Sequence, residues 1–76
     1  MNPSDLTPVK SSNVAAVGHD GTALYVQFHG SKGKPPVLYR YPTAGKEHHE
    51  AMLATDSPGR YVLDRIRNHH AGERVG

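Results

Sequence analysis

Pro42 separates two parts of the chain whose apolar residues repeat with different periods. Before it, residues 23–29 alternate between apolar and polar side chains, which is typical of a β-strand. After it, Tyr61, Val62 and Ile66 recur at helical spacing, so one face of a helix requires burial. Proline lacks the N–H that a central strand needs and therefore ends the strand pattern. The sequence predicts a small sheet followed by helices.

Turn residues and helix signals divide these parts into five elements. Asp20-Gly21 predicts a tight turn, and the Gly- and Pro-rich residues 30–36 predict a longer loop. Ser57 and Pro58 suit the N-cap and first position of a helix. The expected fold is α+β: a three-stranded antiparallel β-meander followed by two α-helices packed on one face (β-β-β-α-α), with strands at residues 13–18, 23–29 and 37–41 and helices at residues 46–55 and 58–69.

The predicted core is small for the length of the chain. The chain has 76 residues, 36% of them apolar, and no cysteine that could form a disulfide. The expected core residues lie between sheet and helices: Leu24, Val26, Phe28, Val37, Tyr39, Leu53, Tyr61 and Ile66. A core this thin favours a homo-oligomer, with Tyr25, Leu38 or an exposed strand edge as the contact.

Composition also sets expectations for organisation and location. Residues 1–10 read as a flexible N-terminal arm, residues 11–70 as one domain and residues 71–76 as a polar tail. No apolar run approaches the length needed to span a bilayer, and the first residues lack a signal-peptide core. A cytoplasmic protein without a membrane partner is therefore expected.

With the elements placed, the chain resembles the KTSC domain family, named after the C-terminal region of certain lysyl-tRNA synthetases. That resemblance implies a small α+β fold and no established chemistry. Three features depart from the family pattern: His19 replaces an aromatic residue, Val62-Leu63 replaces an aromatic-Asn pair, and the loop of residues 30–36 is longer than usual. The matching motifs are residues 12–18 (SNVAAVG), Leu24-x-Val26-x-Phe28, Tyr39-Arg40-Tyr41-Pro42, Met52-Leu53-Ala54, Ser57-x-Gly59-x-Tyr61 and Ile66-Arg67.

The start of the second predicted helix is a candidate phosphate site. Arg60 lies in the first helical turn, where a cation opposes the helix dipole unless an anion is nearby. Ser57 and Gly59 leave backbone N–H groups that an anion can approach, although the same residues also suit a plain helix cap. The formal net charge of +2 agrees with a phosphate-bearing partner. Further candidate phosphate ligands are Lys32, Lys34, Arg40 and Arg67.

Two tyrosines on the last predicted strand allow two interpretations. Tyr39 and Tyr41 flank Arg40, and aromatic rings beside a cation on a small sheet can stack nucleic-acid bases. Alternatively, both rings face the helices and supply core volume that the chain otherwise lacks. The scarcity of apolar residues favours the core interpretation.

Catalysis and metal binding have little support in the sequence. The doublets His48-His49 and His69-His70 offer imidazoles, but adjacent helical residues diverge, and the His-Glu-x-x-His pattern is absent. No cysteine, nucleophile elbow or paired carboxylate indicates an enzyme, so neither catalytic residues nor a cofactor are expected. The predicted function is a small non-catalytic module that binds nucleic acid or another phosphate-containing ligand. The alternatives are an oligomer that sequesters a small nucleotide and a structural protein–protein interaction module.

Overall fold

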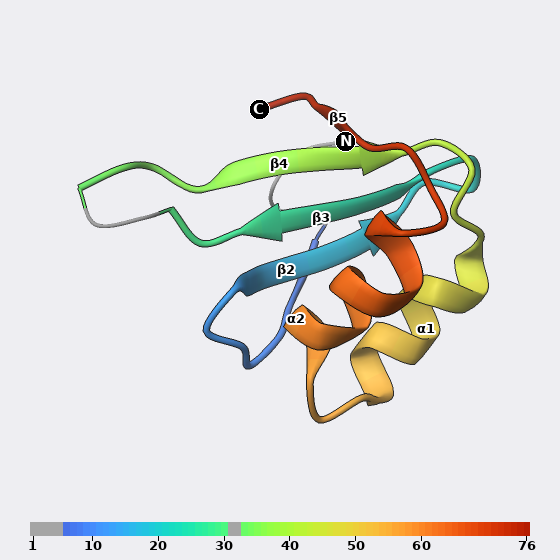
Figure 1. The fold of residues 1–76 in the computed structure, drawn as a ribbon, viewed down its shortest axis with the longest axis horizontal. Coiled ribbons are helices and arrows are strands. Elements are labelled where there is room, and N and C mark those ends of the chain that lie inside the picture. Colours follow the sequence, from blue (N-terminus) through green and yellow to red (C-terminus); the bar gives the residue numbers. More distant parts are fainter. Residues whose placement is uncertain (1–5, 31–32) are drawn as a thin grey trace.

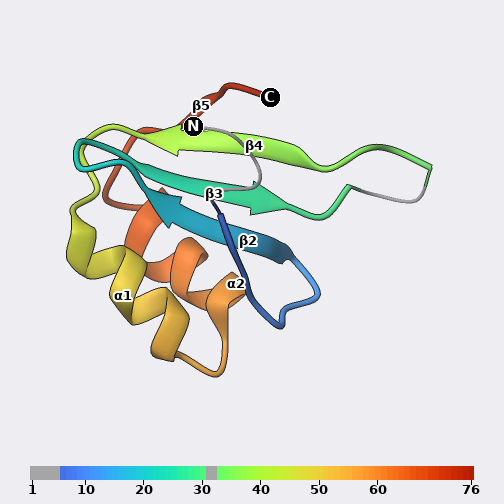
Figure 2. The ribbon, with the colours of Figure 1, turned by 180° about the vertical axis from the view of Figure 1, so that it is seen from behind.

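The computed structural model describes residues 6–30 and 33–76 as an antiparallel sheet with helices on one face (Figures 1 and 2). The strands lie in the sheet in chain order, β1-β2-β3-β4-β5. No helix in the described part of the chain is long and apolar enough to cross a membrane. The elements are β1 (Thr7–Pro8), β2 (Val14–His19), β3 (Leu24–Phe28), β4 (Val37–Tyr41), α1 (Lys46–Ala54), α2 (Pro58–Tyr61), the π-helix η2 (Val62–Arg67) and β5 (Glu73–Arg74).

The α+β class and the antiparallel meander of β2, β3 and β4 are confirmed, but the predicted number of three strands is wrong. The segments expected to be an arm and a tail each add a two-residue edge strand, β1 beside β2 and β5 beside β4. These strands pair through backbone groups, and their side chains are exposed, so no apolar alternation marks them in the sequence. Lys32, in the predicted loop, lies outside the described residues.

A β-bulge in β2 determines which side chains reach the helices. Val14 pairs with Phe28 and Val17 pairs with Val26, and the register shifts between Val14 and Ala16. Residues three apart in a regular strand point to opposite faces, so without this extra residue only one of the two valines would face the helices. Both are instead fully buried in the main core. The bulge therefore doubles the contribution of β2 to the core.

The turn between β2 and β3 is held by the carboxylate of Asp20. One oxygen accepts hydrogen bonds from the backbone N–H of Thr22 and of Ala23 and from the Thr22 hydroxyl, each at 2.8 Å. The other accepts the Tyr25 hydroxyl at 3.1 Å. These bonds hold the pKa of Asp20 well below its ordinary value, and the bond from the Thr22 backbone N–H has the largest effect. Gly21 has a φ of 95° there, a conformation that favours glycine.

The sheet face opposite the helices carries a second, smaller cluster. Tyr25 and Leu38 lie in it, each less than a tenth exposed, beside Leu6 from the start of the described chain. Tyr25 and Leu38, predicted as possible contacts for self-association, are therefore largely covered within the described chain. Leu6, which falls in the part of the chain expected to be a flexible arm, packs on this face instead. Self-association through a strand edge stays a prediction.

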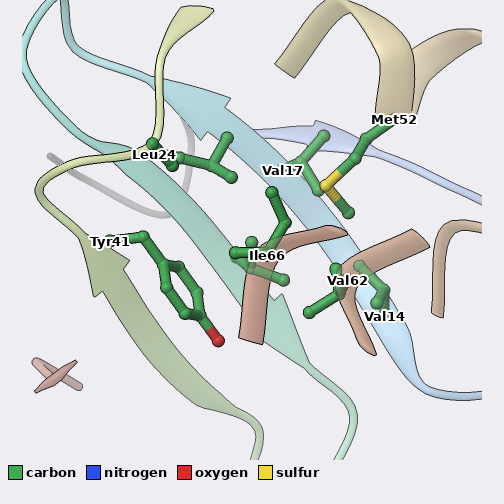
Figure 3. Packing of buried hydrophobic residues seen from close by; sticks show 9 residues of the cluster. Val14, Val17, Leu24, Tyr41, Met52, Val62 and Ile66 are labelled. Atoms are coloured by element: carbon green, nitrogen blue, oxygen red, sulfur yellow. The ribbon is translucent and has the colours of Figure 1, made fainter. Parts of the chain in front are cut away.

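On the helix-facing side, Met52, Val62 and Ile66 are fully buried against the sheet (Figure 3). Leu53, predicted in the core, is 45% exposed, because its neighbour Met52 takes the inward position of α1. The second helix also differs from the prediction. It begins as an α-helix at Pro58 and continues as the π-helix η2, which ends two residues before the predicted end.

Ile66 is the side chain that fixes η2 to the sheet, and its removal tests this packing. Ile66→Ala should lower the free energy of unfolding by about 2–5 kcal/mol, since a fully buried side chain leaves a cavity. Leu63→Ala, on the same helix but half-exposed, should change it by less than about 0.5 kcal/mol. Urea titration followed by circular dichroism measures both. Equal small losses for the two variants would contradict the docking of η2.

Candidate ligand-binding groove

The β3–β4 hairpin extends beyond the helices and leaves part of its helix-facing side open (Figure 1). This side carries three half-buried side chains, those of Phe28, Val37 and Tyr39. Phe28 of β3 pairs with Val37 of β4, and Tyr39 lies two residues further along β4. With Tyr41 they line a hollow of about 230 Å³. Arg67, the last residue of η2, borders the same hollow. The open half of the sheet therefore forms an aromatic floor beside a cation.

Two further hollows adjoin this floor, and Arg67 borders both. The larger, about 520 Å³, shares Phe28 and is also lined by Asn13 and His29. The other, about 270 Å³, shares Tyr39 and Tyr41 and is lined by residues 70–72. We refer to the three hollows together as the Arg67 groove.

The charge of the Arg67 groove is positive. None of the described residues that line its hollows is acidic. Arg67 takes part in neither of the ion pairs found among residues 6–30 and 33–76. Its charge also acts on the floor: burial raises the pKa of Tyr41, and the nearby guanidinium offsets part of that rise. The guanidinium is thus left without an internal carboxylate beside a concave surface.

The floor rings contact one another in sequence. Phe28 meets Tyr39 edge-on, with ring centroids 5.7 Å apart, and Tyr39 stacks beside Tyr41 at 6.4 Å. Tyr41 is 3% exposed and belongs to the main core, so the core interpretation holds for this residue. Tyr39 packs against that core but is only half-buried. Tyr39 therefore supplies core volume and also leaves part of its ring accessible.

The predicted phosphate residues at the start of α2 do come together, in a hollow of about 220 Å³ that adjoins the 520 Å³ hollow of the Arg67 groove through Asn13 and Gly59. Ser57, Gly59 and Arg60 line it together with Lys10, which the sequence reasoning did not single out. Ser57 occupies the N-cap position, as predicted, but its side chain makes no capping hydrogen bond within the described residues. Arg60 forms a loose, exposed ion pair with Asp64 at 3.4 Å. This cation is therefore partly neutralised by its own helix.

The other described candidate phosphate ligands lie apart from these residues and from one another. Arg40 lies on the face opposite the helices, since strand side chains alternate, and it bonds to Glu73 at 2.8 Å. Lys34 is exposed in the loop before β4 and lines none of these hollows. Arg67 and Arg60, which both lie in the second predicted helix, border different hollows. Only Arg67 joins the predicted tyrosines.

Phe28 and His29 were missed as groove residues. The alternation of β3 placed Phe28 in the core, and nothing in the pattern indicated that the helices stop short of it. His29 is oriented by its ring Nε2, which donates to the Ser11 carbonyl at 3.1 Å. The sequence does contain an indication of this position. Phe28 is the last helix-facing residue before a long loop, and two short helices cannot cover a sheet as far as that loop.

Histidines gather between α1 and the end of η2. His48 Nδ1 and the Tyr61 hydroxyl are hydrogen-bonded at 2.9 Å, and the rings of His48 and His70 meet edge-on at 5.2 Å. Nε2 of His49 is buried without a hydrogen-bond partner among the described residues. Within residues 6–30 and 33–76, no group of three His, Cys, Asp or Glu side chains gathers to hold a metal ion.

The sheet order and the helix layer define a small α+β domain. The chain belongs to the KTSC domain family, whose model matches residues 10–70. It is similar in structure to a KTSC domain protein from Yersinia pestis, with a TM-score of 0.76 and 25% sequence identity. The similarity covers 93% of this chain and 96% of that one. No curated protein matches the chain.

The missing capping bond of Ser57 leads to a prediction. Ser57→Ala should change the free energy of unfolding by less than about 0.5 kcal/mol, because no side-chain hydrogen bond is lost. Asp20→Ala removes four hydrogen bonds from the β2–β3 turn and should lower the melting temperature clearly. Thermal denaturation compares the two variants. A loss for Ser57→Ala as large as that for Asp20→Ala would contradict the absence of a cap.

The histidines of α1 predict weaker folding in acid. Burial disfavours the charged rings, so the pKa values of His48 and His49 lie below the ordinary 6.5. The unfolded chain therefore binds protons first as the pH falls, and their contribution to stability is complete above pH 6.5 and declines below it. The melting temperature should fall from pH 7.5 to pH 5.5, and less in a His48→Gln/His49→Gln variant. An equal fall in both proteins would overturn this prediction.

Proposed function

We propose that this protein is a non-catalytic binding module that takes a phosphate-containing ligand in the Arg67 groove. The observation that carries the proposal is the position of Arg67 at the junction of three hollows whose described lining contains no carboxylate. A guanidinium is always charged and forms paired hydrogen bonds to phosphate oxygens.

The other cations offer less. Arg40 is held by Glu73, and Arg60 lies opposite Asp64. An anion at either position has to compete with a carboxylate that is already present, whereas one at Arg67 does not. The hollow at the start of α2, with Lys10 and Arg60, also includes Asp56 in its lining. The Arg67 groove is therefore the best candidate for the phosphate site.

The matched variants Arg67→Ala and Arg65→Ala test the proposal. Both remove one exposed arginine from η2, but Arg65 lines none of the described hollows. The probe is a fluorescein-labelled single-stranded oligothymidylate decamer, followed by fluorescence anisotropy. Arg67→Ala should weaken binding about tenfold, as expected for one charged hydrogen-bonded contact. It should also reduce the log–log salt slope by about 0.7, the share of one phosphate on a single strand.

Arg60→Ala serves as the second comparison, because it removes a cation from the hollow at the start of α2. It should bind the probe like the parent at matched salt. If Arg60→Ala weakens binding and Arg67→Ala does not, the phosphate site lies at the helix start and the proposal is wrong. It is also wrong if Arg67→Ala and Arg65→Ala have equal effects.

A further inference from the structure

The rings of β3 and β4 form a row along the floor of the Arg67 groove. The centroids of Phe28, Tyr39 and Tyr41 follow one another at 5.7 Å and 6.4 Å. Phe28 and Tyr39 are half-buried and line the central hollow, so each offers part of its ring to the groove. Partly open aromatic rings supply a surface on which another flat ring can stack.

Arg67 borders the same hollow as these rings. A plain phosphate ion would use the guanidinium and leave the rings uncovered, whereas an uncharged aromatic ligand would use only the rings. A nucleotide carries both chemistries, because its base stacks on aromatic side chains and its phosphate binds arginine. The juxtaposition therefore matches a nucleotide better than either simpler ligand.

The residues that the hollows share show that they form one continuous track. Phe28 lines the hollows of about 520 Å³ and 230 Å³, and Tyr39 and Tyr41 line those of about 230 Å³ and 270 Å³. Arg67 borders all three. One free nucleotide fills a single hollow, whereas a strand of linked nucleotides follows the whole track. The bases of a duplex are covered on both faces by their neighbours and are not free to stack here.

We infer that the Arg67 groove binds single-stranded nucleic acid, with bases stacked on Phe28 and Tyr39 and the backbone phosphates at Arg67. This inference rests on the proposed function and names the ligand class of the same site.

The first experiment separates bases from phosphates. Fluorescence anisotropy compares the oligothymidylate decamer with an abasic deoxyribose-phosphate decamer that has the same number of phosphates. The abasic decamer should bind at least about tenfold more weakly, since stacking on aromatic side chains contributes strongly for each base. A ten-base-pair duplex should also bind more weakly than the single strand. Equal binding of the decamer and its abasic counterpart overturns the inference.

The second experiment uses two conservative variants of Phe28. Phe28→Leu keeps an apolar side chain but removes the aromatic face, and Phe28→Tyr keeps the ring. Phe28→Leu should bind the oligothymidylate decamer several-fold more weakly and the abasic decamer like the parent, while Phe28→Tyr should bind both like the parent. Melting temperatures confirm that both variants fold. A Phe28→Leu variant that binds the oligothymidylate decamer like the parent overturns the stacking.

Competition by thymidine monophosphate tests the length of the ligand. The monophosphate should displace the labelled decamer only at concentrations far above those at which the unlabelled decamer does so, because a single nucleotide occupies only one hollow. If the monophosphate and the unlabelled decamer displace the probe at similar concentrations, the inference of a strand is wrong and the groove binds a free nucleotide. Arg67-dependent binding without base dependence removes this inference but leaves the proposed function. Binding that does not depend on Arg67 removes both.

Discussion

The bulge in β2 is the constraint on which the rest of the structure depends. It turns both Val14 and Val17 toward the helices, so the main core forms against β2 and β3. Val62 and Ile66 pack there and draw η2 over that half of the sheet. A helix layer this short leaves the far part of the β3–β4 hairpin uncovered (Figure 1). The groove is thus a consequence of where the core lies.

Side-chain periodicity predicted the parts of this fold that depend on side chains. It placed β4 at its observed bounds and found the inward Ile66, because each rests on apolar residues at a clear spacing. It failed for β1 and β5, which pair through backbone atoms. For the candidate site it named Arg67, Tyr39 and Tyr41, but it could not tell which of the predicted cations lies beside the rings. Arg40 and Arg67 look equivalent in the sequence, yet strand alternation sends one to the opposite face.

The positions of the acidic residues determine which arginines keep an unpaired positive charge among the described residues. Glu73 is brought to Arg40 by the pairing of β5 with β4, and Asp64 meets Arg60 one helical turn away. Neither acid forms an ion pair with Arg67 within residues 6–30 and 33–76. A net charge of only +2 can therefore still leave one concentrated positive site, since what matters for an anion is the local balance and not the total.

The turn at Asp20 and the histidines of α1 respond to acid over different ranges. The carboxylate of Asp20 keeps its hydrogen bonds far below neutral pH, whereas the rings of His48 and His49 become costly to keep neutral below pH 6.5. Mild acid should therefore reduce the stability that α1 contributes before it affects the hydrogen bonds of the β2–β3 turn. Because Met52 of α1 packs in the same core as Ile66 and the valines of β2, a loss of stability in the helix layer is shared by the whole core. The acid tolerance of the fold is thus set by its helices and not by its tightest turn.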